Sequence, residues 1–130
     1  MSVKTIECML DWVESNLKNE PTLDKMSEYV GYSSYYCSAK FHEAVGVSFK
    51  EYVVRRKLSL AAAELCETGE RIIDIAVKYG FSSNEAFSRS FNKYYGYTPS
   101  RFRSVRPYFP EYGRNVSTPP LLSKISGSRS

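Results

Sequence analysis

The sequence has little of what membrane, secreted and disulfide-rich proteins depend on. No apolar run approaches the roughly 20 residues of a membrane-spanning helix. Because an amphipathic pattern begins directly after Met1, we expect no signal peptide. The three cysteines, Cys8, Cys37 and Cys66, contain no C-x-x-C pair. We therefore expect buried, unreactive thiols in a reducing cytoplasm, with no disulfide framework or zinc knuckle.

Side chains for catalysis or for holding a metal ion are equally scarce. His42 is the single histidine, and no second ligand lies at a useful spacing from it. The sequence also shows no Ser/His/Asp arrangement and no cluster of carboxylates. We therefore expect neither an enzyme nor a cofactor or metal site, and we expect His42 to be a solvated or phosphate-facing residue.

The charge is unevenly distributed along a chain of ordinary globular composition. The 130 residues carry a net charge of +4, with 42% hydrophobic and 25% charged residues, which suits one domain with a tail. Residues 1–39 carry a net −3, residues 40–103 a net +4 and residues 104–130 a net +3. An anionic partner is possible, and the acidic first third would then face away from it.

Apolar residues recur at helical spacing through the first hundred residues. Ile6, Leu10, Val13 and Leu17 form one helix face, and no alternating strand pattern of useful length occurs before residue 104. Further helices are expected over about 23–30, 33–45, 48–67, 72–79 and 83–95, with a short turn of helix after Pro99. The glycines and serines between these segments fit helix ends and N-caps, and Ser48 with Glu51 forms a capping box.

The helical pattern occurs twice, which indicates an internal duplication. A short helix, a glycine turn and a serine-capped helix recur about 50 residues later. With a shift of 49, Leu23, Met26, Gly31 and Tyr32 fall on Ile72, Ile75, Gly80 and Phe81. With a shift of 50, Ser33, Ser38, Phe41, Gly46, Ser48 and Tyr52 fall on Ser83, Ser88, Phe91, Gly96, Thr98 and Phe102. Two such units are the arrangement of two helix-turn-helix motifs, with the long helix at 48–67 between them.

The second copy carries a motif of a known family. Residues 72–103 contain I-x-x-I-A-x-x-x-G-F, then F-S-R-x-F, then G-x-T-P-x-x-F-R. This segment closely resembles the signature of the AraC/XylS transcription regulators, and residues 23–56 match the family's first unit and linker helix. The resemblance covers about residues 4–103 and is greatest to the short MarA/SoxS type, while the basic, proline-rich tail is similar to Rob-like members.

The resemblance implies an all-α fold of about seven helices. Residues 1–103 would form the DNA-binding domain: a first helix-turn-helix lobe at 4–47, the linker helix at 48–67 and a second lobe at 70–103. Helices 33–45 and 83–95 would then enter adjacent major grooves of double-stranded DNA. The implied function is that of a sequence-specific cytoplasmic regulator, an activator that binds as a monomer and contacts RNA polymerase.

The outward faces of these two helices give the candidate base contacts. In the first helix Cys37, Phe41 and Val45 point inward, and in the second Phe87, Phe91 and Tyr94 do so. The expected base-contacting residues are Tyr35, Ser38, Ala39, Asn84, Glu85 and Arg89. Arg89 suits a bidentate contact to guanine, although it could instead pair with Glu85. Ala39 can only touch a thymine methyl group, and it stands where members of this type often carry arginine.

Phosphate contacts are expected at helix N-termini and from basic side chains. Backbone amides at the start of a helix attract phosphate, and lysine and arginine neutralise it. The candidates are Ser33, Ser34, Lys40, Lys50, Ser82, Ser83, Lys93, Arg101 and Arg103. Arg56, in the linker helix, matches a family arginine and is expected to be structural, with Asp74 as a possible partner.

Two other interpretations of the chain remain open. Residues 104–130 are rich in proline and serine, and Leu121, Leu122 and Ile125 could form a short strand. This segment is a flexible tail, a docked extension, or the start of a domain absent from this chain. In the last case the chain is the DNA-binding portion of a ligand-responsive regulator. Alternatively, the near-neutral residues 1–103 form a helical protein-interaction module that has lost DNA binding.

Overall fold

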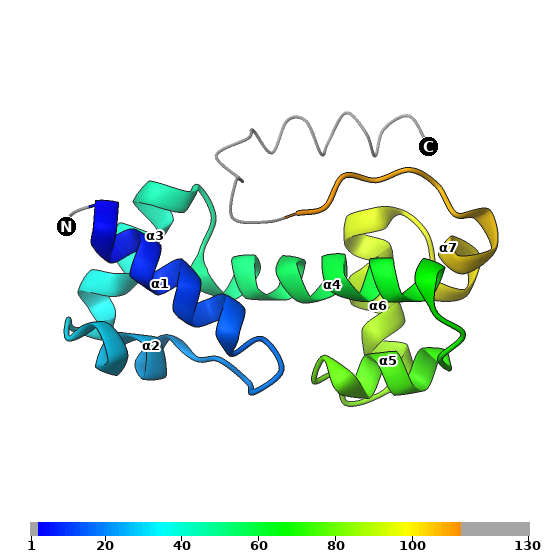
Figure 1. Cartoon of the computed structure of the whole chain (residues 1–130), viewed down its shortest axis with the longest axis horizontal. Helices are drawn as coiled ribbons and strands as arrows, with labels where there is room; N and C mark the ends of the chain where they lie inside the picture. Colours follow the sequence, from blue (N-terminus) through cyan, green and yellow to red (C-terminus); the bar gives the residue numbers. More distant parts are fainter. Residues whose placement is uncertain (1–2, 113–130) are drawn as a thin grey trace. The chain divides into compact units, whose positions relative to one another are not determined.

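The computed structural model describes residues 3–112, and this part of the chain consists of seven α-helices without a strand (Figure 1). The expected all-α fold is confirmed. The chain divides into two compact units, here called the first lobe, up to Val54, and the second lobe, from Arg55 onward. The helices are α1 (Val3–Ser15), α2 (Leu23–Val30), α3 (Ser34–Val45), α4 (Phe49–Glu67), α5 (Ile72–Lys78), α6 (Asn84–Tyr95) and α7 (Pro99–Val105).

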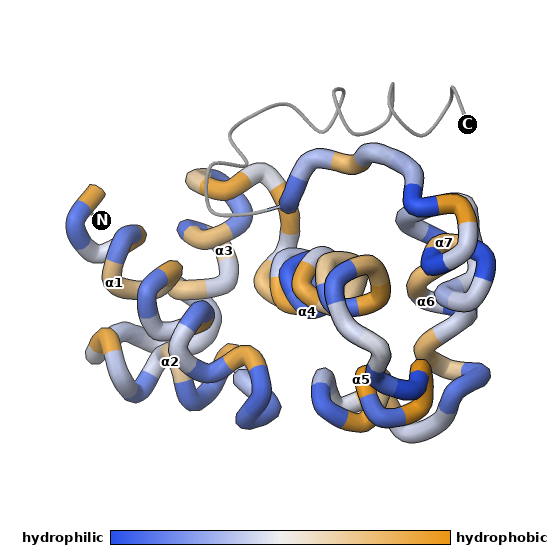
Figure 2. The backbone as a smooth tube through the Cα atoms, turned by 45° about the vertical axis from the view of Figure 1, so that its right-hand side comes forward, coloured by the Kyte–Doolittle hydropathy of each residue, from blue (hydrophilic) through white to orange (hydrophobic). Residues whose placement is uncertain are grey.

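The first lobe packs α1, α2, α3 and the first turns of α4 around one apolar core. Hydrophilic and hydrophobic residues alternate along the helices, as expected where each helix buries one face (Figure 2). Met9, Val13, Met26, Phe41 and Tyr52 are fully buried. The ring of Phe41 lies edge-on to Tyr52, with a centroid distance of 5.5 Å. Aromatic pairs of this kind hold α3 against α4 within the lobe.

The ends of α3 and α6 are set by matching residues. Each helix begins after a serine whose hydroxyl accepts the N–H of the residue three positions on, with distances of 3.1 Å at Ser33 and 3.0 Å at Ser83. Each ends at a glycine, Gly46 with φ +96° and Gly96 with φ +74°. Other residues adopt this left-handed conformation only at a cost, so glycine stops the helix there. Both capping predictions are confirmed.

The second lobe has an aromatic core. Phe87, Phe91 and Phe102 are buried together with Leu65 and Ile75. The rings of Phe91 and Phe102 meet edge-on, with 5.1 Å between their centroids. These residues come from α4, α5, α6 and α7, so the orientation of α6 depends on large side chains of the three other helices.

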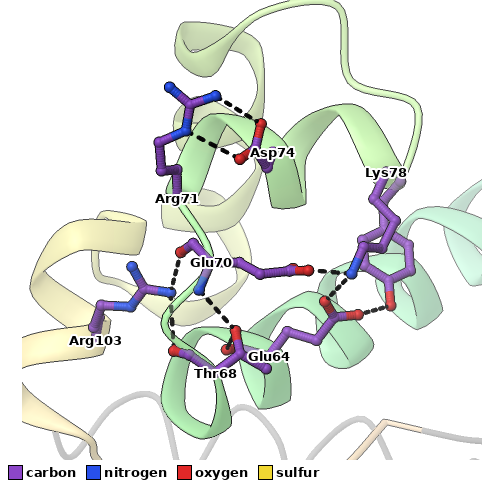
Figure 3. A network of polar contacts seen from close by, with 8 residues as sticks. Glu64, Thr68, Glu70, Arg71, Asp74, Lys78 and Arg103 are labelled. Atoms are coloured by element: carbon purple, nitrogen blue, oxygen red, sulfur yellow. Dashed lines mark hydrogen bonds and ion pairs between the residues drawn. The ribbon is translucent and has the colours of Figure 1, made fainter.

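A polar network joins the end of α4 to α5 (Figure 3). Lys78 donates to Glu64 at 2.5 Å and to Glu70 at 2.9 Å, and the Tyr79 hydroxyl also donates to Glu64. Burial alone would raise the pKa of Glu64, but the bonds from Lys78 and Tyr79 outweigh it and the pKa is lowered. The same bonds to carboxylates raise the pKa of Lys78, and burial with the Glu64 bond raises that of Tyr79. The network fixes α5, the first helix of the second helix-turn-helix.

Arg56 and Asp74, which the sequence suggested as a pair, each have a different partner. Asp74 pairs with Arg71 through bonds of 3.0 and 3.2 Å, so the suggested Arg56–Asp74 pair is wrong. Arg56 is instead buried, with 7% of its surface exposed, and donates to Glu111 at 3.1 Å and to the Tyr112 carbonyl at 2.7 Å. Its structural role is confirmed, although with a different partner.

Residues 106–112, here called the strap, run back from α7 along α4 (Figure 1). The backbone N–H of Tyr112 donates to Ser59 at 2.9 Å, and Phe109 packs against Tyr95 with 5.1 Å between ring centroids. A flexible tail from residue 104 onward is therefore wrong for this stretch, which is docked. The possible strand at Leu121, Leu122 and Ile125 lies outside the described residues.

Candidate nucleic-acid interface

Helix α3 buries one face and exposes the other. Cys37 and Phe41 are fully buried, and Val45 is 8% exposed, as the sequence predicts. On the opposite face lie four exposed side chains, those of Tyr35, Ser38, Ala39 and His42. Tyr35 is 87% exposed, which is unusual for so large an aromatic side chain. This face therefore offers a phenol, a hydroxyl, a methyl group and an imidazole to a partner.

Helix α6 presents a comparable face with different chemistry. Phe87 and Phe91 are fully buried, but the third inward residue is Tyr95, at 9% exposure, and not Tyr94 as expected. Tyr94 is half-buried at the edge of the lobe, where the Arg55 guanidinium lies 5.1 Å from its ring centroid. The outward side chains are Asn84, Glu85 and Arg89, all exposed. The expected orientation of these three residues agrees with the structure.

The charged side chains near the start and middle of α6 can contact a binding partner, whereas Lys40 of α3 already forms an ion pair within the protein. Within residues 3–112, no hydrogen bond or ion pair joins the side chains of Glu85 and Arg89 to each other or to other protein groups. Lys40 forms an ion pair with Glu43 at 3.3 Å and lies 5.7 Å from the ring centroid of Tyr36. Lys93 lies beside the Tyr94 ring at 5.4 Å, toward the end of α6.

The serines at the two helix starts are not equivalent. The Ser34 hydroxyl donates to Asp24 at 2.6 Å, in a hollow also lined by Glu28 and Ser33. The carboxylates of Asp24 and Glu28 oppose a phosphate at this place. The start of α6 has Ser82 exposed and Ser83 half-buried as the cap, with Glu85 as the acidic residue of its first turn.

Arg103 has a role that the sequence did not reveal. Its guanidinium donates to the carbonyls of Thr68 at 3.4 Å and Glu70 at 2.7 Å (Figure 3). It also donates to the carbonyl of Leu65 at 2.8 Å. These carbonyls lie at and beyond the end of α4, where helical partners are missing. The structure therefore uses Arg103 to close α4, and the phosphate contact expected of it stays a prediction. Lys50 and Arg101 remain exposed.

The structure also shows the exposure of the cysteines and whether the described residues could hold a metal ion or span a membrane. Cys37 is buried and Cys66 is half-buried, but Cys8 is exposed, so the expectation of a buried thiol is wrong for Cys8. Among the described residues, no group of three or more His, Cys, Asp or Glu side chains could hold a metal ion. No helix within residues 3–112 is long and apolar enough to cross a membrane.

Comparison with known proteins identifies the family. A family model described as a helix-turn-helix domain matches residues 26–104. The transcriptional activator AarP of Providencia stuartii is 39% identical over 95 residues, which cover 73% of this chain and 70% of AarP. The multiple antibiotic resistance protein MarA of Escherichia coli K12 is 36% identical over 99 residues, which cover 76% of this chain and 78% of MarA.

The structural comparison agrees. The C-terminal domain of the response regulator yesN from Fusobacterium nucleatum superposes with a TM-score of 0.72 at 29% identity, covering 77% of this chain and 98% of that domain. The family is one of DNA-binding regulators and not of enzymes. The chain therefore belongs to the AraC/XylS family of helix-turn-helix transcriptional regulators.

Proposed function

We propose that this chain activates transcription by reading an asymmetric DNA site with α3 and α6. The observation that carries the proposal is the pair of 12-residue helices, each capped by serine, ended by glycine and exposed along its outward face. Tyr35, Ser38 and Ala39 would read one half-site, and Asn84, Glu85 and Arg89 the other. The name of AarP, a transcriptional activator, supports activation as the direction of control.

Phosphate contacts would fix the position of each helix on the duplex. Exposed Lys50 and Arg101 have no protein partner for their charge within residues 3–112, and Lys93 is held only beside a ring. These three are the cations we assign to phosphate, together with the amides at Ser82 and Ser83. Lys40, Ser33 and Ser34 contribute less, because Glu43 and Asp24 already pair with Lys40 and Ser34.

The remaining parts of the proposal concern the number of protein molecules on the DNA, the contact with RNA polymerase and the cellular compartment. The two recognition helices would occupy successive major grooves, about 34 Å apart along the duplex, so that one monomer suffices. Activation would follow from contact with RNA polymerase in the cytoplasm. Co-sedimentation with polymerase on a promoter fragment and the mass of the protein–DNA complex test these two points.

A titration tests the proposed DNA binding. Duplexes are selected from a random library, and the affinity of the best one is compared with that of a scrambled duplex at physiological salt. We expect a preference of about a thousandfold or more, and an affinity that falls by about 0.9 log units per neutralised phosphate for each log unit of salt. Equal affinities would overturn the proposal and favour a protein-interaction module.

The Arg89→Ala variant distinguishes a sequence-specific base contact from sequence-independent electrostatic attraction to phosphate. If the guanidinium clamps guanine O6 and N7, the variant loses discrimination at one base pair, by a factor of about 5 to 150. Lys50→Ala is the matched control, because it should weaken binding to every duplex alike and reduce the salt slope by about one. Uniform weakening by Arg89→Ala would make Arg89 a phosphate contact.

A further inference from the structure

Corresponding positions of α3 and α6 can be compared residue by residue. Both helices have 12 residues between a serine cap and a glycine, so residues 50 apart stand at the same height on each helix. Ala39 and Arg89 are both the sixth residue, and Tyr35 and Glu85 are both the second. All four side chains are exposed. Residues four apart on a helix share one face, so each helix presents one such pair outward.

The two pairs have opposite chemistry. The outward pair of α3 is a phenol ring and a methyl group, and the lysine beside it, Lys40, is paired with Glu43. The outward pair of α6 is a carboxylate and a guanidinium, neither of which has a protein partner within the described part of the chain. A methyl group cannot donate or accept a hydrogen bond. Position 39 therefore distinguishes bases only through apolar contact.

We propose that the first lobe recognises its half-site by thymine C5-methyl groups, whereas the second lobe recognises guanine and cytosine by hydrogen bonds. This inference deepens the proposed function and rests on it. Thymine is the only normal base with a methyl group in the major groove, so the Ala39 methyl and the Tyr35 ring are suited to it. Arg89 would donate to guanine O6 and N7, and Glu85 would accept from the N4 amino group of cytosine.

The proposal predicts how each half-site responds to the loss of single atoms from the DNA. Replacing thymine by deoxyuridine removes only the C5-methyl group. In the first half-site we expect each effective replacement to weaken binding about fourfold, the value for one buried methyl group. Replacing guanine by 7-deazaguanine removes the N7 acceptor, and in the second half-site it should weaken binding about fivefold or more.

The cross-over controls are part of the same experiment. Deoxyuridine in the second half-site and 7-deazaguanine in the first should leave the affinity within about twofold, because Arg89 and Glu85 would not contact a thymine methyl group, and the Ala39 methyl and the Tyr35 ring would not contact guanine N7. Arg89→Ala identifies the second half-site, since this variant should no longer respond to 7-deazaguanine. The proposal is overturned if deoxyuridine has no effect in the first half-site, or has the same effect in both.

A single substitution in α3 gives a second, independent test. Ala39→Arg places at the sixth position of α3 the residue that α6 carries there. Position 39 is exposed and arginine is a good helix former, so the variant should fold. A repeated selection should then yield guanine in place of thymine in the first half-site, sensitive to 7-deazaguanine. An unchanged first half-site would contradict the inference.

Failure of this inference is distinguishable from failure of the proposed function. A chain that discriminates selected from scrambled duplexes but ignores thymine methyl groups would bind DNA as proposed and would read its first half-site by other contacts. A chain without any such discrimination would lose both proposals. The titration of unmodified duplexes therefore precedes the modified series.

Discussion

The docking of the strap can be tested by removing one aromatic ring. Phe109 is half-buried and lies near Tyr95, Phe102 and Tyr97, with centroid distances of 5.1, 5.9 and 6.4 Å. Full burial of a phenylalanine contributes up to about 3 kcal/mol, and aromatic pairs contribute about 0.5–1.5 kcal/mol more. For a ring that is only half-buried, we expect Phe109→Ala to lower the free energy of unfolding of the second lobe by about 2 kcal/mol.

Thermal unfolding measures this loss. For a unit of this size, about 2 kcal/mol corresponds to a fall in Tm of roughly 8–16 °C. The matched control is Tyr108→Ala, because Tyr108 is the neighbouring aromatic residue and is 89% exposed. It should leave Tm unchanged within a few degrees. If both variants unfold at the temperature of the parent chain, the strap contributes no stability and the docked conformation is refuted.

Two further predictions concern the polar groups of the second lobe. Glu64→Gln should destabilise the lobe at neutral pH and progressively less in acid: the lowered pKa of Glu64 means that its stabilisation is complete above its ordinary pKa of 4.5 and is lost as pH falls through the lowered value. A Tm difference that stays constant down to pH 2 would argue against this. Arg103→Ala should cost about 1–3 kcal/mol of stability, since α4 loses its closing bonds, whereas Arg101→Ala should weaken DNA binding and leave Tm unchanged. Equal Tm values for these two variants would contradict the separate roles.

Local signals explain why the helices and their ends could be predicted from sequence. The caps at Ser33 and Ser83 depend on bonds across three residues, and the positive φ of Gly46 and Gly96 depends on one residue alone. Periodicity located the buried faces, except where two adjacent tyrosines fitted equally well. There the structure buries Tyr95 and leaves Tyr94 beside Arg55.

Contacts between distant residues explain what the sequence could not predict. Arg103 bonds to carbonyls 33 to 38 residues earlier, and Arg56 bonds to Glu111, 55 residues later. Nothing in the local sequence distinguishes such an arginine from Arg89, which faces outward without a partner in residues 3–112. The candidate base contacts face outward because helix periodicity places them opposite the buried residues of α3 and α6.

The most direct measurement of the central claim is missing-base interference on the selected duplex. Removal of single bases shows which positions the protein needs for binding. We predict two clusters of sensitive bases about one helical turn apart. In the Arg89→Ala variant, the guanine of the second cluster should no longer be sensitive. A single cluster, unchanged by substitutions in either α3 or α6, would contradict a protein that reads DNA with two helices.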